Sequence, residues 1–427
     1  MLNKSILLDV MNTTLEDINP KNLITNACSY KDNILTINNE EIVIPKDKKI
    51  YVFGSGKAVQ SMAESIYSIL ENKIEKMFLV GPYEQEFDMK NVKYLQSSHP
   101  LPSQKSVTAA IKITEELKKL SNDDIFIYLL SGGNSALVEM PADNISLKDF
   151  ELATSLMLKA SMPIEAINCV RKHISLVKGG GLCNYTEAKG HILVLSDVMG
   201  DNFEDIGSAP FYYDKTMFQD AYDYLKKYKS FNDLPVSIKE HIIKGIDKKI
   251  PDTLKEESKN IKHYIIGSNT VFLKNIEHQL LQKDIPSIVY ESSIKDDVEV
   301  VCKKFLDFCQ TGEKGCFIFG GEATVLVTGE GKGGRNQHLV LRFLEQFPKN
   351  NDILFLSIAS DGIDGNSTAA GAIVDRSTLD EVNKCTLDMT KYSQNFDSNS
   401  FLREIGALVE PGPTHNNMLD AVVIYIK

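Results

Sequence analysis

The chain has 427 residues and a formal net charge of −11 at pH 7. This length exceeds what one hydrophobic core usually organises, so we expect two domains. The acidic balance argues against nucleic acid and against an anionic membrane surface as partners, because both favour a basic face. Any anionic small molecule must therefore be bound by a local basic pocket.

The cysteines and histidines show no metal-binding or disulfide pattern. Seven cysteines are scattered without a CxxC pair, and eight histidines lack the HExxH spacing. No window is long and apolar enough to span a membrane, and the N-terminus lacks a signal-peptide cleavage pattern. These features predict a reduced cytoplasmic protein without structural zinc and without a membrane partner.

The first elements along the chain are a helix over residues 5–17 and a small hairpin of strands 34–37 and 42–44, which turns at Asn38 and Asn39. From residue 50 a different format recurs, in which a short apolar strand ends in a polar turn that a helix usually follows. This format predicts parallel α/β layers, with strands at residues 50–53, 125–130, 192–195, 264–266 and 353–359.

The region of residues 227–262 is rich in Lys, Asp and Glu and contains two prolines. It indicates a change of domain, so we expect an N-terminal domain over residues 1–250 and a C-terminal domain over 251–427. Ligands of open parallel sheets bind beyond the carboxyl ends of the strands, where the glycines, serines and aspartates of this sequence gather.

The densest group of glycines lies in residues 320–337, GGEATVLVTGEGKGGRNQ. Such a group is typical of a tight turn or of amides that wrap an anion. Arg335 stands at the expected start of a helix, where N–H groups and the helix dipole favour negative charge. We predict an anion site, with phosphate as the preferred ligand; the alternative is a flexible loop. Gly329, Gly331 and Gly334 also match the dinucleotide-binding pattern, and Asp361 ends the next strand, where such folds place an acid that binds ribose. An NAD(P)-dependent oxidoreductase is therefore an alternative function.

A second glycine turn, Gly54-Ser55-Gly56-Lys57, follows the strand at residues 50–53. It is not a P-loop, because Ala58 stands where that motif needs Ser or Thr. A strand, a glycine turn and a lysine at a helix start nevertheless suit an anionic substrate or a transferring phosphoryl group. The alternative is a solvated lysine at a helix start.

The turn at residues 131–135, SGGNS, resembles a backbone nest for a carboxylate or a phosphate. Ser135 lacks the glycine spacing of an esterase nucleophile. Positive charge gathers at residues 170–173 and 178–181, either as part of a ligand site or as a solvated helix end. His99 is equally compatible with a packed turn and with a ligand contact.

Four acids, Asp197, Glu322, Asp361 and Asp364, lie at or near the expected strand ends. Strand-end carboxylates can hold magnesium or accept a hydroxyl proton, and phosphoryl transfer needs both functions. Each acid alone could simply cap a turn. Together they favour phosphoryl transfer.

The ordered motifs resemble those of the glycerate 2-kinase family, whose C-terminal part is called the MOFRL domain. The resemblance spans nearly all of residues 50–422 and rests on VFGSGKAVQSMAE, SSHPLP, LLSGGNSALVEMP, INCVRKHISLVKGGGL, LSDVMGDN, GGEATV, GKGGRNQ, SDGIDG with AAGA, and PGPTHNN. It implies an α/β fold: a Rossmann-like N-terminal domain with a parallel sheet, a smaller C-terminal α/β domain that includes the MOFRL-type region at about 315–422, and a cleft between them. It also implies transfer of the γ-phosphate of ATP to the 2-hydroxyl of D-glycerate, with Mg²⁺ as the cation.

The resemblance places the family's catalytic lysine on Lys57 and its catalytic arginine on Arg335. Its cleft acids fall on Asp197, Glu322 and Asp361, which become the candidates for Mg²⁺, and Asp197 or Asp361 would orient the hydroxyl. The remaining candidates for binding substrate or nucleotide are Gly54, Ser55, Gly56, Ser131, Gly132, Gly133, Asn134, Ser135, Gly333, Gly334, Asn336, Asn416 and Asn417.

The sequence departs from the family pattern around this core, at Ser103, Gly181, Asn202, Ala209, His338, Thr368 and residues 412–417. The acceptor could therefore be a longer or differently charged hydroxy acid. A non-catalytic sensor of sugar acids is a further alternative. The expected partner is a small hydroxy acid, and the oligomeric state, including a homo-oligomer, is left open.

Overall fold

The computed structural model describes residues 2–348, 351–384 and 387–427. Packing divides the chain into two compact units. Unit 1 comprises Met1–Leu23, Ser196–Asp201 and Gly267–Lys427, and unit 2 comprises Ile24–Leu195 and Asn202–Ile266. This division differs from the single boundary expected near residue 250, because α1 (Lys4–Asp17) packs against α10 (Asn269–Gln282) and so belongs with the C-terminal part.

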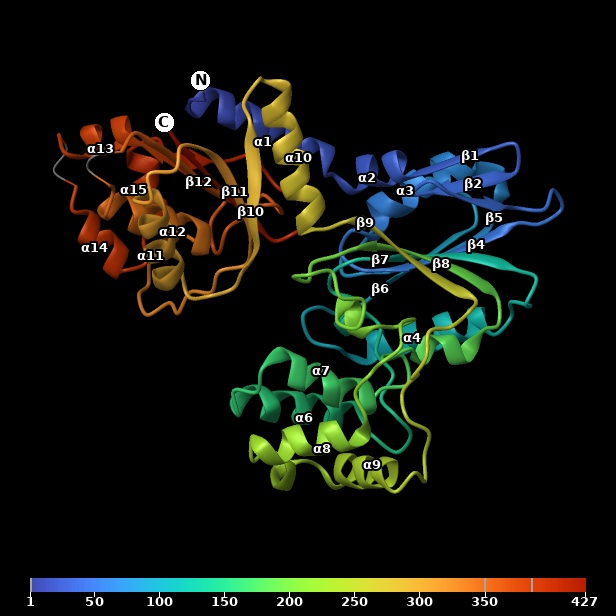
Figure 1. Cartoon of the computed structure of the whole chain (residues 1–427). Helices are drawn as coiled ribbons and strands as arrows, with labels where there is room; N and C mark the ends of the chain where they lie inside the picture. The colour runs from blue at the N-terminus through green and yellow to red at the C-terminus, as the bar shows by residue number, and fades with distance from the viewer. Residues whose placement is uncertain (1, 349–350, 385–386) are drawn as a thin grey trace. The chain divides into compact units, whose positions relative to one another are not determined.

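Unit 2 is built on a parallel six-stranded sheet in the order β6-β5-β4-β7-β8-β9. The chain leaves β4 toward β5 and β6, then returns to form β7 on the other side of β4. Ligand crevices of open α/β sheets form at such a reversal of strand order. Figure 1 shows α3 on one face of the sheet and α4 on the other. The bounds are β4 (Ile50–Ser55), α3 (Val59–Leu70), η1 (Glu71–Lys73), β5 (Ile74–Gly81), β6 (Val92–Gln96), α4 (Gln104–Leu117), β7 (Ile125–Leu130), α5 (Asn134–Leu137), η2 (Gly181–Tyr185), β8 (Lys189–Leu195), η3 (Ile206–Ser208) and β9 (Ile261–Gly267).

Four helices of unit 2 form a cluster with a hydrophobic core of its own, which includes Phe150, Ala166, Ala221 and Ile238 (Figure 1). They are α6 (Leu147–Lys159), α7 (Ile164–His173), α8 (Phe218–Lys227) and α9 (Val236–Ile246), with η4 (Phe231–Asp233) between the last two. The charged region at residues 227–262 therefore includes a packed amphipathic helix, because every third or fourth residue of α9 is apolar and buried.

A small antiparallel sheet precedes the parallel one. It consists of β1 (Cys28–Lys31), β2 (Ile34–Ile37) and β3 (Glu40–Val43), after α2 (Pro20–Ala27). The expected hairpin and the expected opening helix are confirmed. Asn38 and Asn39 have φ values of 47° and 67°, the left-handed conformation that a tight two-residue turn requires.

Unit 1 contains a mixed six-stranded sheet in the order β10-β11-β15-β12-β13-β14. The strand expected at residues 353–359 exists as β12, but it runs antiparallel to both neighbours, β15 and β13. The parallel expectation for this strand is wrong because the last strand of the chain inserts between β11 and β12. A strand buried on both faces has the same apolar sequence in either case. The bounds are β10 (Ser287–Ile294), β11 (Gly315–Gly321), β12 (Ile353–Ala359), β13 (Gly371–Asp375), β14 (Leu408–Val409) and β15 (Asp420–Ile426).

The helices of unit 1 enclose an aromatic-rich core around Phe305, Phe319, Phe343, Phe355 and Phe401. Within the described ranges, none of the helices has the length and apolar character that crossing a bilayer would need. Besides α1 and α10 the helices are α11 (Val298–Cys309), α12 (Arg335–Glu345), α13 (Arg376–Val382), α14 (Met389–Gln394) and α15 (Ser398–Glu404).

Candidate active site

The carboxyl ends of β4 and β7, at the reversal of strand order in unit 2, are joined by backbone hydrogen bonds. The amide of Lys57 donates to the Gly132 carbonyl at 2.9 Å, and that of Ser131 donates to the Ser55 carbonyl at 3.1 Å. A Cβ on Gly56 would lie 2.0 Å from Ser131 Oγ, and φ at Gly56 is 137°. Only glycine permits this approach. The result is a rigid turn that carries Lys57.

The Lys57 side chain is exposed, and its ammonium forms no hydrogen bond or ion pair with any residue of the described ranges. It lies beside Gly133, where a Cβ would be 3.5 Å from Lys57 Cγ and 3.0 Å from His99 Cδ2. Burial and the nearby Lys57 charge both lower the pKa of His99. Lys57, which has no side-chain partner among the described residues, therefore lies beside an imidazole whose neutral form is favoured.

Ser55 and Asn134 are buried and contact each other. The Ser55 hydroxyl also lies 2.6 Å from that of Tyr128, and Asn134 Nδ2 donates to the Gly207 carbonyl at 2.9 Å. In this arrangement both side chains are hydrogen-bonded within unit 2 and support the turn. Direct ligand contact by these two residues stays a prediction.

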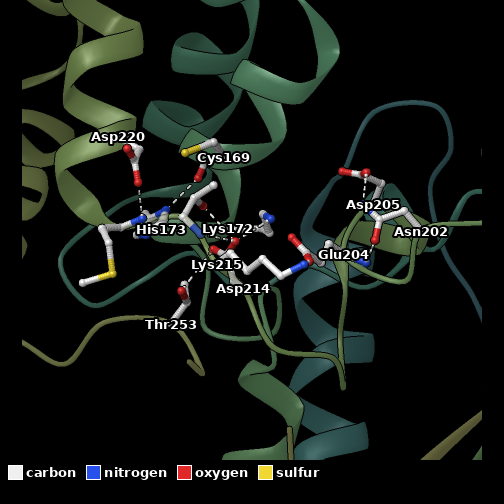
Figure 2. Close-up of polar contacts among 12 residues, drawn as sticks. Cys169, Lys172, His173, Asn202, Glu204, Asp205, Asp214, Lys215, Asp220 and Thr253 are labelled. Atoms are coloured by element: carbon white, nitrogen blue, oxygen red, sulfur yellow. Dashed lines mark hydrogen bonds and ion pairs between the residues drawn. The ribbon is translucent and has the colours of Figure 1, made fainter. Parts of the chain in front are cut away.

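The basic stretch that follows is neither a solvated helix end nor an open basic patch, because three of its cations have carboxylate partners. Lys172 Nζ lies 2.7 Å from Asp214, His173 Nε2 lies 3.0 Å from Asp252, and Lys178 Nζ lies 2.9 Å from Glu139. Figure 2 shows the Lys172–Asp214 pair. The three acids lie far from their partners in sequence, so spacing gave no signal for these pairs.

Burial and pairing shift the pKa values of this buried charge cluster in opposite directions. Burial lowers the pKa of His173, but the hydrogen bonds to Asp252 and to Cys169 together outweigh it and raise that pKa to about 9. Burial lowers the pKa of Lys178 to about 8 against the attraction of Glu139. Although burial alone would raise the pKa of Asp252, its bonds to His173 and Lys255 hold that pKa well below its usual range.

The glycine loop in unit 1 uses its amides within the chain. Gly331 N donates to the Asn395 carbonyl at 3.0 Å, Lys332 N to the Asp397 carboxylate at 3.0 Å, and Gly333 N to Asn366 Oδ1 at 2.8 Å. These three amides have their hydrogen-bond partners within the chain. Close packing explains the glycine at position 329, because a Cβ there would lie 2.3 Å from the Asn395 carbonyl oxygen. The anion site at this loop stays a prediction.

The start of α12 is capped by the buried carboxylate of Asp364. It accepts from Asn336 N at 3.2 Å and from Gln337 N at 2.8 Å. Burial raises the pKa of Asp364, and the bonds to the two amides oppose that shift. A Cβ on Gly334 would lie 2.2 Å from Asp364 Oδ1, so the glycine admits this cap. The negative charge expected at this helix start is present, and the chain itself supplies it.

Arg335 is held between two carboxylates. Asp420 accepts from Nε at 2.6 Å and from Nη2 at 3.0 Å, while Glu322 accepts from Nη1 at 2.6 Å. Burial raises the pKa of Asp420 to about 6 against the attraction of Arg335. Sequence reasoning missed Asp420. The available signal was an acid directly before the apolar run 421–424, the first residue of β15.

The three acids considered for magnesium, Asp197, Glu322 and Asp361, do not form a ready metal site. The described parts of the chain contain no group of three His, Cys, Asp or Glu side chains placed to hold an ion. Glu322 pairs with Arg335, and Asp361 Oδ1 accepts from Ile363 N at 3.0 Å. The residues present therefore do not fit a metal centre made of protein ligands alone.

Asn416 and Asn417 shape the turn that leads into β15. Asn416 is buried and donates to the Ile18 carbonyl at 2.6 Å, and Asn417 Oδ1 accepts from Leu419 N at 3.0 Å. Their predicted contact with a ligand is not tested by this arrangement.

Several departures from the family pattern are accommodated locally. His338 is buried and stacks on Phe396 with ring centroids 4.6 Å apart. Ser103 caps α4 and accepts from Lys105 N at 3.1 Å. Asn202 Nδ2 donates to Asp205 at 3.0 Å, as Figure 2 shows. A Cβ on Gly181 would lie 2.3 Å from the Leu176 carbonyl oxygen, so any other residue there needs a different backbone.

Comparison with known proteins finds similarity to the same proteins along nearly the whole chain. A family model described as "Domain of unknown function (DUF4147)" matches residues 6–243, and the model of the MOFRL family matches residues 315–420. A glycerate 2-kinase of Pyrococcus horikoshii is 32% identical over 99% of this chain and 97% of its own length. A crystal structure of a protein from that organism superimposes with a TM-score of 0.88 at 31% identity, covering both chains fully.

A second solved structure is similar over nearly the whole chain. The crystal structure of glycerate kinase (EC 2.7.1.31) from Thermotoga maritima has a TM-score of 0.86 at 29% identity and covers 99% of both chains. A relative with a different name is a putative hydroxypyruvate reductase of Agrobacterium vitis, which is 28% identical over 88% of this chain and 86% of its own length.

Proposed function

We propose that this chain, which belongs to the glycerate 2-kinase family, transfers the γ-phosphate of ATP to the 2-hydroxyl of D-glycerate. The observation that carries the proposal is the full-length similarity to glycerate kinases together with Lys57, a lysine on a rigid turn at the strand reversal of unit 2 that has no partner among the described residues. Helix starts and strand ends of this kind suit transferring phosphoryl groups.

In the proposed reaction the glycerate hydroxyl oxygen attacks the γ-phosphorus. The bond from that phosphorus to the β,γ-bridging oxygen breaks, and ADP leaves with the bridging oxygen. The hydroxyl proton passes to the carboxylate of Asp197 or Asp361. Lys57 and Arg335 would offset the charge on the transferring group, so catalysis would consist mostly of positioning and electrostatics. The expected cleft between the two domains stays a prediction.

ATP and magnesium are the proposed cofactors. Magnesium sites in phosphoryl-transfer enzymes commonly consist of one or two carboxylates plus substrate phosphates. Because the protein acids do not form a metal centre by themselves, we propose that Mg²⁺ enters with the nucleotide and assign no step to it. A cytoplasmic location is proposed as well, since the six cysteines in the described ranges are free thiols.

An oxidoreductase that uses NAD(P) is the second candidate, favoured by the name of the Agrobacterium vitis relative. It would need the Gly329–Gly334 loop to bind a pyrophosphate through its amides. The amides of Gly331 and Gly333 are bonded within the chain, which counts against this candidate.

The test is an assay of ADP release with ATP and Mg²⁺ against both glycerate enantiomers, erythronate and threonate, with NADH and hydroxypyruvate in parallel. We expect ADP release that depends on D-glycerate and is abolished by excess EDTA. NADH oxidation without ADP release would replace the kinase with the oxidoreductase. Thermal stabilisation by an acid without any turnover would indicate a sensor.

A further inference from the structure

Arg171 differs from its basic neighbours because no carboxylate of the described residues pairs with it. Lys172, His173 and Lys178 each have an acid within 3.0 Å. The guanidinium of Arg171 makes one hydrogen bond, from Nη2 to the Ser135 carbonyl at 3.1 Å. Its Nε is buried and has no partner in the part of the chain that the structure describes.

The surroundings of Arg171 leave one positive charge in excess. Lys178 Nζ donates to the same Ser135 carbonyl at 2.9 Å, so two cations share this oxygen. Glu139, the nearby acid, already pairs with Lys178 and attracts Arg171 only at longer range. Accordingly, burial lowers the pKa of Arg171 and Glu139 only partly opposes the shift. A buried cation with unmet donors is costly unless an anion completes it.

The position of Arg171 connects it to the proposed active site within unit 2. Ser135 lies in α5, which begins directly after the turn that follows β7, and Gly133 at the end of that turn lies against Lys57 and His99. This turn stands at the strand reversal, where ligands of open α/β sheets bind. Lys57 and Arg171, two cations that no described carboxylate pairs with, are therefore brought to one edge of one sheet.

We propose that Arg171 binds the carboxylate of the hydroxy-acid acceptor and so sets the specificity for acids over neutral polyols. The inference rests on the proposed function and deepens it. Guanidinium groups match carboxylates with two parallel hydrogen bonds, and a small acid needs such an anchor to present its hydroxyl. Lys57 is then left for the transferring phosphoryl group.

The experiment measures dissociation constants of D-glycerate and of ATP separately by calorimetry, for the wild type, Arg171→Gln and Arg171→Lys. Lys148→Gln is the matched control, since Lys148 is an exposed cation on the neighbouring helix α6. We expect Arg171→Gln to weaken glycerate binding by about tenfold to a hundredfold, as for loss of charged hydrogen bonds. ATP binding should change less than about twofold, and Lys148→Gln should leave both constants within that range.

The anion that binds Arg171 could instead be a phosphate group of ATP. Weaker ATP binding with unchanged glycerate binding in Arg171→Gln would overturn the proposal in favour of that phosphate group. Unchanged binding of both ligands would overturn it in favour of a structural role. If circular dichroism shows that Arg171→Gln does not fold, Arg171→Lys provides the test. Lysine keeps the positive charge but lacks the planar guanidinium that can donate two parallel hydrogen bonds to a carboxylate. We expect glycerate binding at least about threefold weaker there, and wild-type affinity would contradict the proposal.

Calorimetry also separates this inference from the kinase proposal, since binding needs no turnover. A wild type that binds D-glycerate through Arg171 but releases no ADP would refute the kinase and leave the carboxylate site intact. A wild type that phosphorylates D-glycerate, with Arg171→Gln binding it normally, would refute only the role of Arg171.

Discussion

Lys57 is the residue on which the proposed chemistry depends most. Its ammonium has no partner among the described residues, and its backbone is fixed by the bond to Gly132. Replacing it with alanine should remove a preorganised donor, at a cost of about 3 kcal/mol in the transition state and a hundredfold or more in kcat. Steady-state kinetics of Lys57→Ala checks this, with the exposed Lys105→Ala as control. A loss below about threefold with an intact fold would remove Lys57 from the mechanism.

Asp420 is the residue that holds Arg335 in place. Its carboxylate accepts hydrogen bonds from two nitrogens of the guanidinium, whereas Glu322 accepts only from the third. Asp420→Asn should leave Arg335 mispositioned and lower kcat by about tenfold to a hundredfold, the equivalent of a charged hydrogen bond. The matched control is Asp352→Asn, which breaks the exposed pair with Lys427 in the same unit. Equal rates for both variants would exclude a positioning role for Asp420.

The glycine turn between β4 and α3 is the element that places Lys57. Gly56→Ala should combine the strain of a positive φ with a clash against Ser131 and cost about 3 kcal/mol of stability. Gly312 also has a positive φ, but a Cβ there meets nothing within 4 Å. Gly312→Ala should therefore cost only about 1–2 kcal/mol. Denaturant unfolding of both variants compares them, and equal losses would show that the close approach does not matter.

The end of α7 is fastened by a pH-dependent pair, His173 with Asp252. The pKa of His173 is about 9 in the folded protein, against an ordinary value of 6.5 for a solvated histidine. Because the folded pKa is the higher, the pair stabilises fully below pH 6.5, and this contribution is lost as pH rises through 9. The stability difference between wild type and His173→Gln should shrink by up to about 3 kcal/mol over that window.

The measurement is urea unfolding of both proteins at several pH values, and the difference is used so that titration of other groups, such as Lys178 with its pKa of about 8, largely cancels. A difference that stays constant from about pH 6 to about pH 9 would show that folding does not shift the pKa of His173.

Sequence patterns located the opening helix, the small hairpin and five later strands because local signals suffice for these elements. Asn38 and Asn39 marked a turn, and the apolar run at residues 125–130 marked a buried strand. The direction of β12 escaped prediction, since apolar content does not reveal which strand inserts beside it. The acids Glu139, Asp214 and Asp420 escaped for a similar reason, because long-range pairing brings them to their cations.

At the scale of the whole molecule, the order of motifs identified the family, and the full-length similarity bears this out. The packing of residues 1–23 against the C-terminal part was not predictable, because it depends on a contact between α1 and α10 across more than half the chain. The altered positions around the core, such as His338 and Ser103, are explained by local packing and capping. They therefore give no reason by themselves to discard D-glycerate as acceptor.

Phosphorus NMR of the product formed from ATP and D-glycerate tests the central claim most directly, because it reports both the transfer and the hydroxyl that receives the phosphate. A phosphate ester at the 2-position is attached to a carbon with one hydrogen, so proton-coupled spectra should show a new monoester doublet. A triplet would place the phosphate on the terminal CH₂ and contradict the proposed position. Signals of ATP alone, with D-glycerate unchanged, would contradict the glycerate kinase itself.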